Sequence, residues 1–220
     1  MLYSLVIFDL DGTLADSFAW FRRNLNMTAK RYRFRAVAED DVEMLRHAST
    51  QEILDYLEVR WWKIPLIARH LRQLKTAQAA SIPLFPGVAT MLGTLAAHDV
   101  RLALVSSDTE ANAREKLGPS VALFSDFDCS ASIFGKAQKF RRVVKRAGVD
   151  PNAVIAIGDE TRDIEAARTA GIACGAVTWG YAAAKALGDR APDHMFERIE
   201  DIAEAVLARA PAHPPGFVRE

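Results

Sequence analysis

Near-continuous apolar runs recur along the chain and are separated by amphipathic stretches. Residues 2–10, 101–107 and 154–159 form the clearest runs, and the last two end in small or acidic residues. Such runs are typical of strands that are buried on both faces of a parallel sheet. Weaker runs of the same kind occupy residues 124–130, 173–178 and 193–196.

The stretches between these runs carry apolar residues at helical spacing. Helices are predicted over four ranges, 88–98, 140–147, 164–170 and 199–208, and Gly171 provides a stop signal for the third. Strands that alternate with helices predict an α/β fold, with a doubly wound, Rossmann-like parallel sheet.

The segment between the first predicted strand and the rest of the sheet differs from both. Residues 16–82 contain several amphipathic helical patterns and no convincing strand, and two prolines in residues 82–87 prevent a helix from continuing there. We therefore expect an all-helical cap domain over residues 16–82, inserted into a core of residues 1–15 and 83–220. The proline-containing tail, residues 211–220, is expected to lack regular structure.

Composition and charge narrow the classes of partner. The chain has 220 residues, 28 Lys and Arg, and 28 Asp and Glu, so its formal net charge is zero. Such a balance provides no global attraction to nucleic acid or to a membrane. The apolar start is too short for a signal peptide or a membrane span. We expect a cytoplasmic protein, either a monomer or a homodimer, whose partner is a small molecule.

Two carboxylates directly follow the first predicted strand. The segment reads Asp9-Leu10-Asp11-Gly12-Thr13-Leu14, and ligands of open α/β sheets bind beyond the carboxyl ends of the strands. Two acids that turn toward one site require a counter-charge, for which a divalent cation with oxygen ligands is the best candidate. The alternative is a solvated turn whose aspartates cap the backbone.

This segment resembles the first signature of the haloacid dehalogenase-like superfamily, in its phosphatase form. The remaining signatures follow in the expected order: Val105-Ser106-Ser107, then Lys136, then the GDETRD run of residues 158–163. The resemblance covers essentially the whole chain. Residues 85–88 and 179–181 are similar to the phosphoglycolate-phosphatase-like branch, which has a small helical cap.

The resemblance implies a role for each acid. Asp9 would attack phosphorus and form an aspartyl-phosphate, and Asp11 would act as general acid and then as general base. Mg²⁺ would be bound by Asp9, the backbone carbonyl of Asp11 and Asp159. Asp163 would reach the same metal, either directly or through water.

The resemblance also implies phosphate-binding groups. Ser106 and Ser107 follow the second signature's strand, and the Ser106 hydroxyl would donate to a phosphate oxygen. Lys136 would supply positive charge to the phosphoryl group and to Asp9. The third signature is atypical here, because Gly135-Lys136-Ala137 replaces the usual Lys-Pro. Lys136 is favoured over Lys139 because it precedes the predicted helix.

Asp11 decides among the reactions known in the superfamily. A second aspartate at this position implies hydrolysis of a phosphoric monoester, with a phosphomutase as the alternative and a non-catalytic binding protein as a weaker one. A small cap implies a small, soluble phosphate ester, such as phosphoglycolate or a sugar phosphate. Arg46, between two cap helices, could meet a substrate carboxylate, or it could be an ordinary surface charge.

Overall fold

A six-stranded, fully parallel sheet forms the centre of the molecule. The computed structural model describes residues 2–129 and 135–208, so the predicted tail, residues 211–220, lies outside the described residues. The strand order is β3-β2-β1-β4-β5-β6. The strands are β1 (Leu5–Phe8), β2 (Arg101–Ser106), β3 (Phe124–Cys129), β4 (Val154–Gly158), β5 (Ala173–Val177) and β6 (His194–Phe196).

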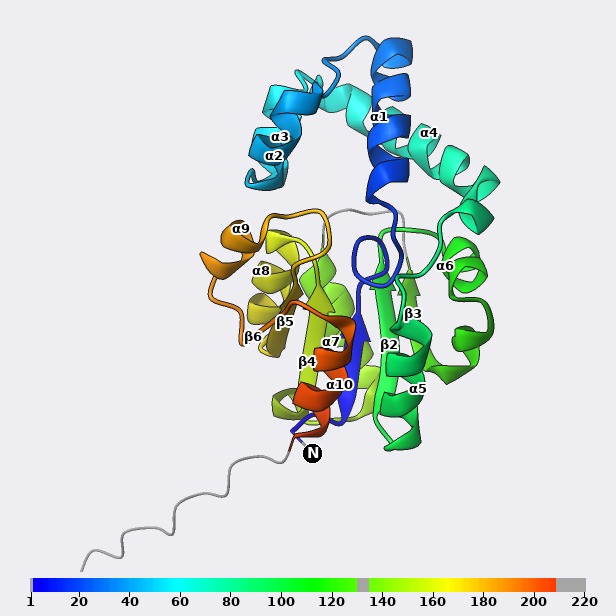
Figure 1. Cartoon of the computed structure of the whole chain (residues 1–220), viewed down its shortest axis with the longest axis vertical. Coiled ribbons are helices and arrows are strands. Elements are labelled where there is room, and N and C mark those ends of the chain that lie inside the picture. Colours follow the sequence, from blue (N-terminus) through cyan, green and yellow to red (C-terminus); the bar gives the residue numbers. More distant parts are fainter. Residues whose placement is uncertain (1, 130–134, 209–220) are drawn as a thin grey trace, which may run out of the picture.

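Helices cover both faces of this sheet (Figure 1). Val6 and Phe8 belong to a core cluster with α5 (Val88–Ala97) and α10 (Ile199–Leu207). The intervening residues of β1 belong to a second cluster with α7 (Lys136–Ala147) and α8 (Thr161–Ala170). Since alternate residues of a strand point to opposite faces, both faces of β1 are buried. The predicted doubly wound α/β fold is confirmed.

The structure differs from the sequence-based prediction at three helices. Helix α7 begins at Lys136, so Lys136 is its first residue and does not precede it. Helices α6 (Glu110–Leu117) and α9 (Ala184–Gly188) were not predicted. Helix α6 buries Asn112 and Lys116 on its inner face, so a search for apolar periodicity could not find it.

Four α-helices lie between β1 and α5. They are α1 (Phe18–Tyr32), α2 (Val42–Arg46), α3 (Thr50–Tyr56) and α4 (Ile64–Ala77), with short 3₁₀ turns at Glu39–Asp41, Trp61–Lys63 and Ala79–Ser81. These four helices, called the cap here, lie together above the sheet, on the side where the chain leaves β1 (Figure 1). Among the described helices, none is both long and apolar enough to cross a membrane.

The two segments that connect the cap to the core run side by side. Ala15 and Leu84 form an antiparallel bridge. The Asp16 amide donates to the Pro83 carbonyl at 2.9 Å, and the Phe85 amide donates to the Leu14 carbonyl at 2.9 Å. The cap is therefore anchored at a single paired hinge next to the end of β1.

The packing of α5 against the sheet provides a test of the core. Leu92 is fully buried in α5, and replacing it with Ala should lower the free energy of unfolding by about 2–5 kcal/mol. Urea denaturation followed by circular dichroism measures the loss. Leu66→Ala on the cap is the matched control, because Leu66 is 43% exposed. An equal loss in the two variants would contradict this assignment of the core.

Candidate active site

The strand order reverses direction between β1 and β4, which are direct neighbours. Asp9 is the first residue after β1, and Asp159 is the first residue after β4. Crevices beyond the carboxyl ends of two such strands are the usual ligand sites of doubly wound sheets. The fold therefore places both carboxylates at the position where a ligand is expected.

The loop after β1 is shaped around Asp159. Gly12 has a φ of +81°, and a Cβ at this residue would lie 2.2 Å from Asp159 Oδ2. Thr13 Oγ1 donates to Asp159 Oδ1 at 2.9 Å. A side chain at residue 12 would be strained and would also overlap the carboxylate, so glycine is required at this position.

The loop after β5 approaches Asp159 from the other side. The Tyr181 amide donates to Asp159 Oδ2 at 2.8 Å, and a Cβ on Gly180 would lie 2.2 Å from Asp159 Cβ. Trp179 Nε1 donates to the Thr13 carbonyl at 3.1 Å, which ties the two loops together. Asp159 is thus held rigidly, and its exposed fraction is zero.

The start of helix α8 orients the third acid. Glu160 is the N-cap residue of α8, and it forms a reciprocal capping box with Asp163. Asp163 Oδ2 accepts a hydrogen bond from the Glu160 amide at 3.1 Å. Oδ1 of the same carboxylate accepts from Lys136 Nζ at 2.5 Å. The capping arrangement fixes Asp163 one turn into the helix, where it faces Asp9.

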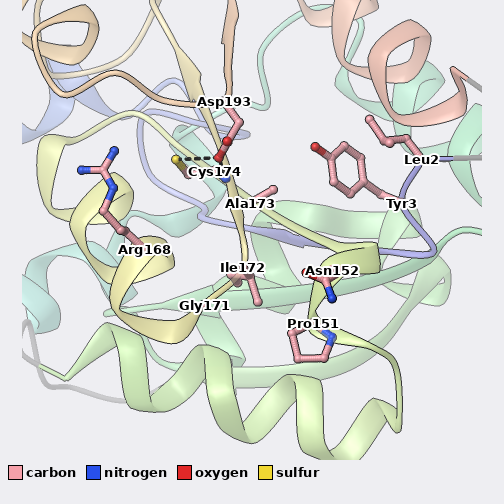
Figure 2. A pocket seen from close by; sticks show the side chains of 10 residues that line it. All are labelled: Leu2, Tyr3, Pro151, Asn152, Arg168, Gly171, Ile172, Ala173, Cys174 and Asp193. Atoms are coloured by element: carbon pink, nitrogen blue, oxygen red, sulfur yellow. Dashed lines mark hydrogen bonds between the residues drawn. The ribbon is translucent and has the colours of Figure 1, made fainter. Parts of the chain in front are cut away.

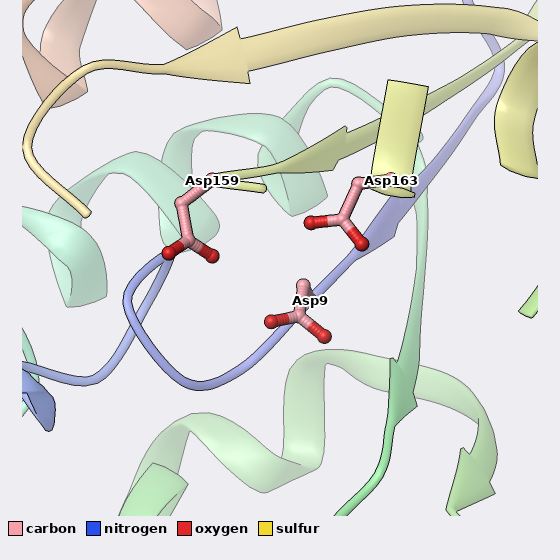
Figure 3. Close-up of side chains that lie close together, drawn as sticks. All are labelled: Asp9, Asp159 and Asp163. Atoms are coloured by element: carbon pink, nitrogen blue, oxygen red, sulfur yellow. The ribbon is translucent and has the colours of Figure 1, made fainter. Parts of the chain in front are cut away.

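Asp9, Asp159 and Asp163 converge on one point (Figure 3). Each contributes a carboxylate oxygen, these oxygens lie within 4.8 Å of one another, and all three residues are buried. Lys136 Nζ donates to Asp9 Oδ1 at 2.7 Å and also contacts Asp163. The predicted candidates Asp9, Asp159, Asp163 and Lys136 are therefore brought together.

The charges in this group do not balance. Burial raises the pKa of Asp9 to about 6, against the attraction of Lys136. Burial, with Glu160 and Asp9 nearby, also raises the pKa of Asp159 well above its usual range. Burial works against Asp163 as well, but Lys136 and Arg162 outweigh it and lower its pKa. Burial is thus the main cause of the raised pKa of Asp9 and Asp159, and neighbouring acids add to it.

A divalent cation would supply the missing charge. With all three carboxylates ionised and Lys136 protonated, two negative charges stay uncompensated within the group. Among the described donors to Asp159, a threonine hydroxyl and a backbone amide are the hydrogen-bond partners, and both are neutral. Carboxylate oxygens are the ligands preferred by Mg²⁺, Ca²⁺ and Mn²⁺. The three acids can therefore hold such a metal.

Asp11 lies in a separate ionic group. Lys116 Nζ donates to its Oδ1 at 3.0 Å, and Lys75 Nζ, from cap helix α4, donates to its Oδ2. Burial alone would raise the pKa of Asp11, but the two ammonium groups lower it to about 2. Asp11 is thus held from both the core and the cap, and both contacts favour its ionised form.

The remaining predicted residues lie around this centre. The Ser106 hydroxyl accepts from the Asp108 amide at 3.0 Å, and Ser107 follows it, half-buried, at the end of β2. Lys139 Nζ donates to the Ser106 carbonyl at 3.0 Å. Lys136 and not Lys139 is therefore the lysine that contacts Asp9.

Arg46 lies at the contact between the cap and the core. Its Nε donates to the Tyr181 carbonyl at 3.1 Å and its Nη2 to the Gly180 carbonyl at 3.3 Å. Its own carbonyl accepts from the Ala183 amide at 2.8 Å. In this arrangement its guanidinium holds the loop that flanks Asp159, and its predicted contact with a substrate stays a prediction.

Several residues of the site were not anticipated from the sequence: Thr13, Lys75, Asp108, Lys116 and Tyr181. Thr13 belongs to the first motif, so its position next to the acids could have been inferred. Asp108 follows the second motif by one residue, which is also a usable signal. Lys75 and Lys116 carry no such signal, because each is one of many helical lysines and arginines in the sequence.

A pocket of about 390 Å³ lies near the amino ends of strands β1, β4, β5 and β6, and Figure 2 shows the residues that line it. Its lining includes Tyr3, Asn152 and Asp193, which precede β1, β4 and β6. Cys174 Sγ points toward Asp193 and donates to it at 3.3 Å, and burial raises the pKa of this thiol. The residues that line this pocket include no group of converging acids, so it is not the candidate active site.

Comparison with known proteins identifies the family. The model of the haloacid dehalogenase-like hydrolases matches residues 6–177. A phosphoglycolate phosphatase of Synechococcus elongatus is 35% identical over 204 residues, which cover 91% of this chain and 96% of the relative.

Solved structures share the fold. A haloacid dehalogenase-like family protein from Streptococcus pneumoniae superposes with a TM-score of 0.77 at 21% identity, over 92% of this chain and 98% of its own. The CbbY protein of Rhodobacter sphaeroides, solved in complex with phosphate, superposes with a TM-score of 0.72 at 19% identity, over 91% of this chain and 96% of its own. The family resemblance predicted from the motifs is confirmed: this chain belongs to the haloacid dehalogenase-like hydrolases, in their phosphoglycolate-phosphatase-like branch.

Proposed function

We propose that this protein is a magnesium-dependent phosphatase that hydrolyses a small phosphate monoester through an aspartyl-phosphate on Asp9. One observation carries the proposal. Asp9 lies where the strand order reverses, between β1 and β4. It accepts a hydrogen bond from Lys136 and lies beside two further buried carboxylates, with which it can hold a cation. An acid in this setting can act as a nucleophile toward phosphorus once its negative neighbours are neutralised.

That the chain is a phosphatase follows from its family and its relatives. The matched family consists of hydrolases, and the Synechococcus relative, which aligns over nearly its full length, is a phosphoglycolate phosphatase. The substrate of that relative makes phosphoglycolate the first ester to test. The relatives give no support to the phosphomutase alternative.

In the first step, an Asp9 carboxylate oxygen forms a bond to phosphorus while the bond to the leaving oxygen breaks. Lys136, held between Asp9 and Asp163, offsets the negative charge of the phosphoryl group. Mg²⁺ bound by Asp9, Asp159, Asp163 and the Asp11 carbonyl would further reduce the repulsion between nucleophile and substrate. In this proposal the Ser106 hydroxyl, at the end of β2, donates to a phosphoryl oxygen.

Asp11 serves both steps. In the first step it donates a proton to the leaving oxygen, and in the second it takes a proton from the water that displaces the Asp9 carboxylate from phosphorus. The ionised state of Asp11 in the structure suits the second step directly. The first step requires Asp11 to take up a proton together with the substrate.

The cap supports a small substrate. Its helices reach the site itself, since Lys75 of α4 contacts Asp11 and Arg46 of α2 contacts the loop beside Asp159. A lid in contact with these residues would restrict the substrate to a compact ester and would exclude water from the reaction. We propose a phosphorylated small acid or sugar as the substrate; the cytoplasmic location stays a prediction.

Metal binding is tested by thermal unfolding. Mg²⁺ should raise the midpoint of wild-type unfolding, because a ligand that binds only the folded state stabilises it by about 2.7 kcal/mol at a hundredfold excess over its Kd. Asp159→Asn should abolish this rise. In EDTA the variant should be as stable as the wild type or more so, because ionised Asp159 is destabilised by burial and by its acidic neighbours. Asp126→Asn, remote from the acids, is the control. An unchanged magnesium effect in Asp159→Asn would contradict the assigned ligand.

Catalysis is tested by phosphate release. With magnesium the wild type should release inorganic phosphate from phosphoglycolate or from another ester in a panel of small acid and sugar phosphates, and EDTA should stop it. Asp9→Asn should lower kcat at least about 10³-fold, because it removes the nucleophile. Asp126→Asn should keep wild-type kcat. If no ester in the panel gave metal-dependent release of inorganic phosphate, the proposed function would be wrong.

A mutase is distinguished by the fate of the phosphoryl group. A phosphatase transfers it to water, so phosphate should accumulate in proportion to substrate consumed. A mutase protects its phosphoenzyme from water, so a sugar phosphate would be isomerised with little phosphate released. Phosphorus NMR of a reaction with a hexose 1-phosphate separates the two, and isomerisation without release would favour the mutase.

A further inference from the structure

The Asp11 carboxylate belongs to a buried group of four charges. Lys116 Nζ donates to Asp11 Oδ1 at 3.0 Å and to Asp108 Oδ2 at 2.9 Å. Lys75 contacts Asp11 and lies 3.6 Å from Asp108 Oδ2. The side chains of Asp108 and Lys116 are fully buried, and those of Lys75 and Asp11 are 15% and 13% exposed. Two carboxylates and two ammonium groups alternate, so the group is electrically neutral.

Asp108 is the fixed member of the group. Its Oδ1 accepts from the Thr109 amide at 2.8 Å and from Asn112 Nδ2 at 2.8 Å, and its Oδ2 accepts from Lys116. Asn112 and Lys116 lie one turn apart on α6, so one face of this helix holds the carboxylate. If Lys116 were removed, Lys75 at 3.6 Å would be the one charged partner left to the buried Asp108 among the described residues.

Lys75 comes from the cap. It lies near the end of α4, and the next residue, Thr76, accepts a hydrogen bond from Asn112 Nδ2 at 3.0 Å. The same asparagine therefore holds Asp108 in the core and contacts the cap. If the cap moves away from the core, Lys75 leaves and the group keeps two carboxylates with one ammonium group.

We infer that Asp108 and Lys116 are positioning residues that aim the Asp11 carboxylate at the reacting oxygen, and that Lys75 completes this arrangement when the cap is closed. The inference rests on the proposed function, because it assumes that Asp11 transfers protons. Asp11 stands on the loop that contains Gly12, and both of its carboxylate oxygens accept from lysines outside that loop. Lys116, fixed by Asp108, restrains one carboxylate oxygen, and Lys75 restrains the other. The cap thereby links substrate enclosure to the placement of the proton-transferring group.

Burst kinetics test this role, because the two chemical steps depend on Asp11 differently. With p-nitrophenyl phosphate the leaving group needs no proton, so phosphorylation of Asp9 proceeds without Asp11. Hydrolysis of the aspartyl-phosphate still needs Asp11 as base. In Lys116→Met the rate of the p-nitrophenol burst should stay within about threefold of the wild-type rate. The steady phase that follows should be at least about tenfold slower than in the wild type. Lys75→Met should show the same pattern with a smaller loss.

An ester with a poor leaving group gives the complementary result. With phosphoglycolate, or whichever alkyl phosphate the wild type prefers, the first step needs a proton from Asp11. Lys116→Met should therefore phosphorylate Asp9 at least about tenfold more slowly than the wild type, and no burst of product should be seen. A role in folding alone would lower the number of active sites and would change both phases in equal proportion.

Controls separate position from charge. Lys145→Met removes an exposed lysine from α7, and Lys30→Met removes an exposed lysine from cap helix α1; both should behave as the wild type. If Lys116→Met does not fold, the double variant Asp108→Asn/Lys116→Met carries the same test, because it removes both members of the buried pair and leaves neither charge alone.

Three outcomes are decisive. A preserved burst with a slowed second phase supports the inference. A second outcome overturns the inference and leaves the proposed function intact. In it the wild type is active, and the Lys116 and Lys75 variants either keep both the burst and the steady phase or show the same proportional decrease in both. A wild type that forms no phosphoenzyme on Asp9 overturns the proposed function and the inference with it; Asp9→Asn, which cannot form one, gives the reference signal.

Discussion

Repulsion among three buried carboxylates is the constraint on which the site depends. Asp9, Asp159 and Asp163 come from two neighbouring strand ends and one helix start, and their oxygens lie within 4.8 Å of one another. Such a group is unfavourable unless charge is supplied from elsewhere. The fold supplies the ammonium group of Lys136, the guanidinium of Arg162, which is itself paired with Glu160, and neutral hydrogen bonds to Asp159. A rigid acid group that lacks positive charge is the form expected of a cation site.

The second ionic group follows the opposite principle. Around Asp11, charges of both signs are equal in number and every member contacts a partner. The three-acid group therefore has fewer positive partners than carboxylates, whereas the group around Asp11 is neutralised by protein alone. The two aspartates of the first motif, two residues apart, thus lie in different electrostatic environments: Asp9 contacts Lys136, and Asp11 contacts Lys75 and Lys116.

The cap contacts the Asp11 group directly and reaches the three-acid group through the loop beside Asp159. One contact joins α4 to α6 and to Asp11, and the other joins Arg46 and α1 to the loop that carries Tyr181. In the second, the Ser17 and Tyr181 hydroxyls lie 2.9 Å apart, and the rings of Phe21 and Tyr181 stack with centroids 5.5 Å apart. The two segments that connect the cap to the core pair through Leu84 and Ala15, which lies four residues after Asp11. A motion of the cap about these segments would therefore occur close to Asp11 and Asp9. Lid position and site geometry are thus mechanically connected.

Local sequence was enough for the strands, most helices and the acids of the site. Near-continuous apolar runs identify buried parallel strands, and acids that follow such runs must meet at one sheet edge, so the sequence alone predicts that Asp9 and Asp159 lie together. Asp163 came from the resemblance of residues 158–163 to the family's fourth signature. These features depend on residues close together in the chain, so a linear pattern contains them.

Other features depend on which distant segments pack together. Helix α6 buries polar residues, so its sequence resembles an exposed segment, and only its contacts with α4 and with the loops after β1 and β2 give Asn112 and Lys116 partners. Nothing near Lys75 distinguishes it from other cap cations, since its partner Asp11 is 64 residues away. The choice between Lys136 and Lys139 was likewise made by the start of α7, which points the first toward Asp9 and the second toward the Ser106 carbonyl. Charge pairing across the fold is a property of three-dimensional proximity, which hydrophobic periodicity does not encode.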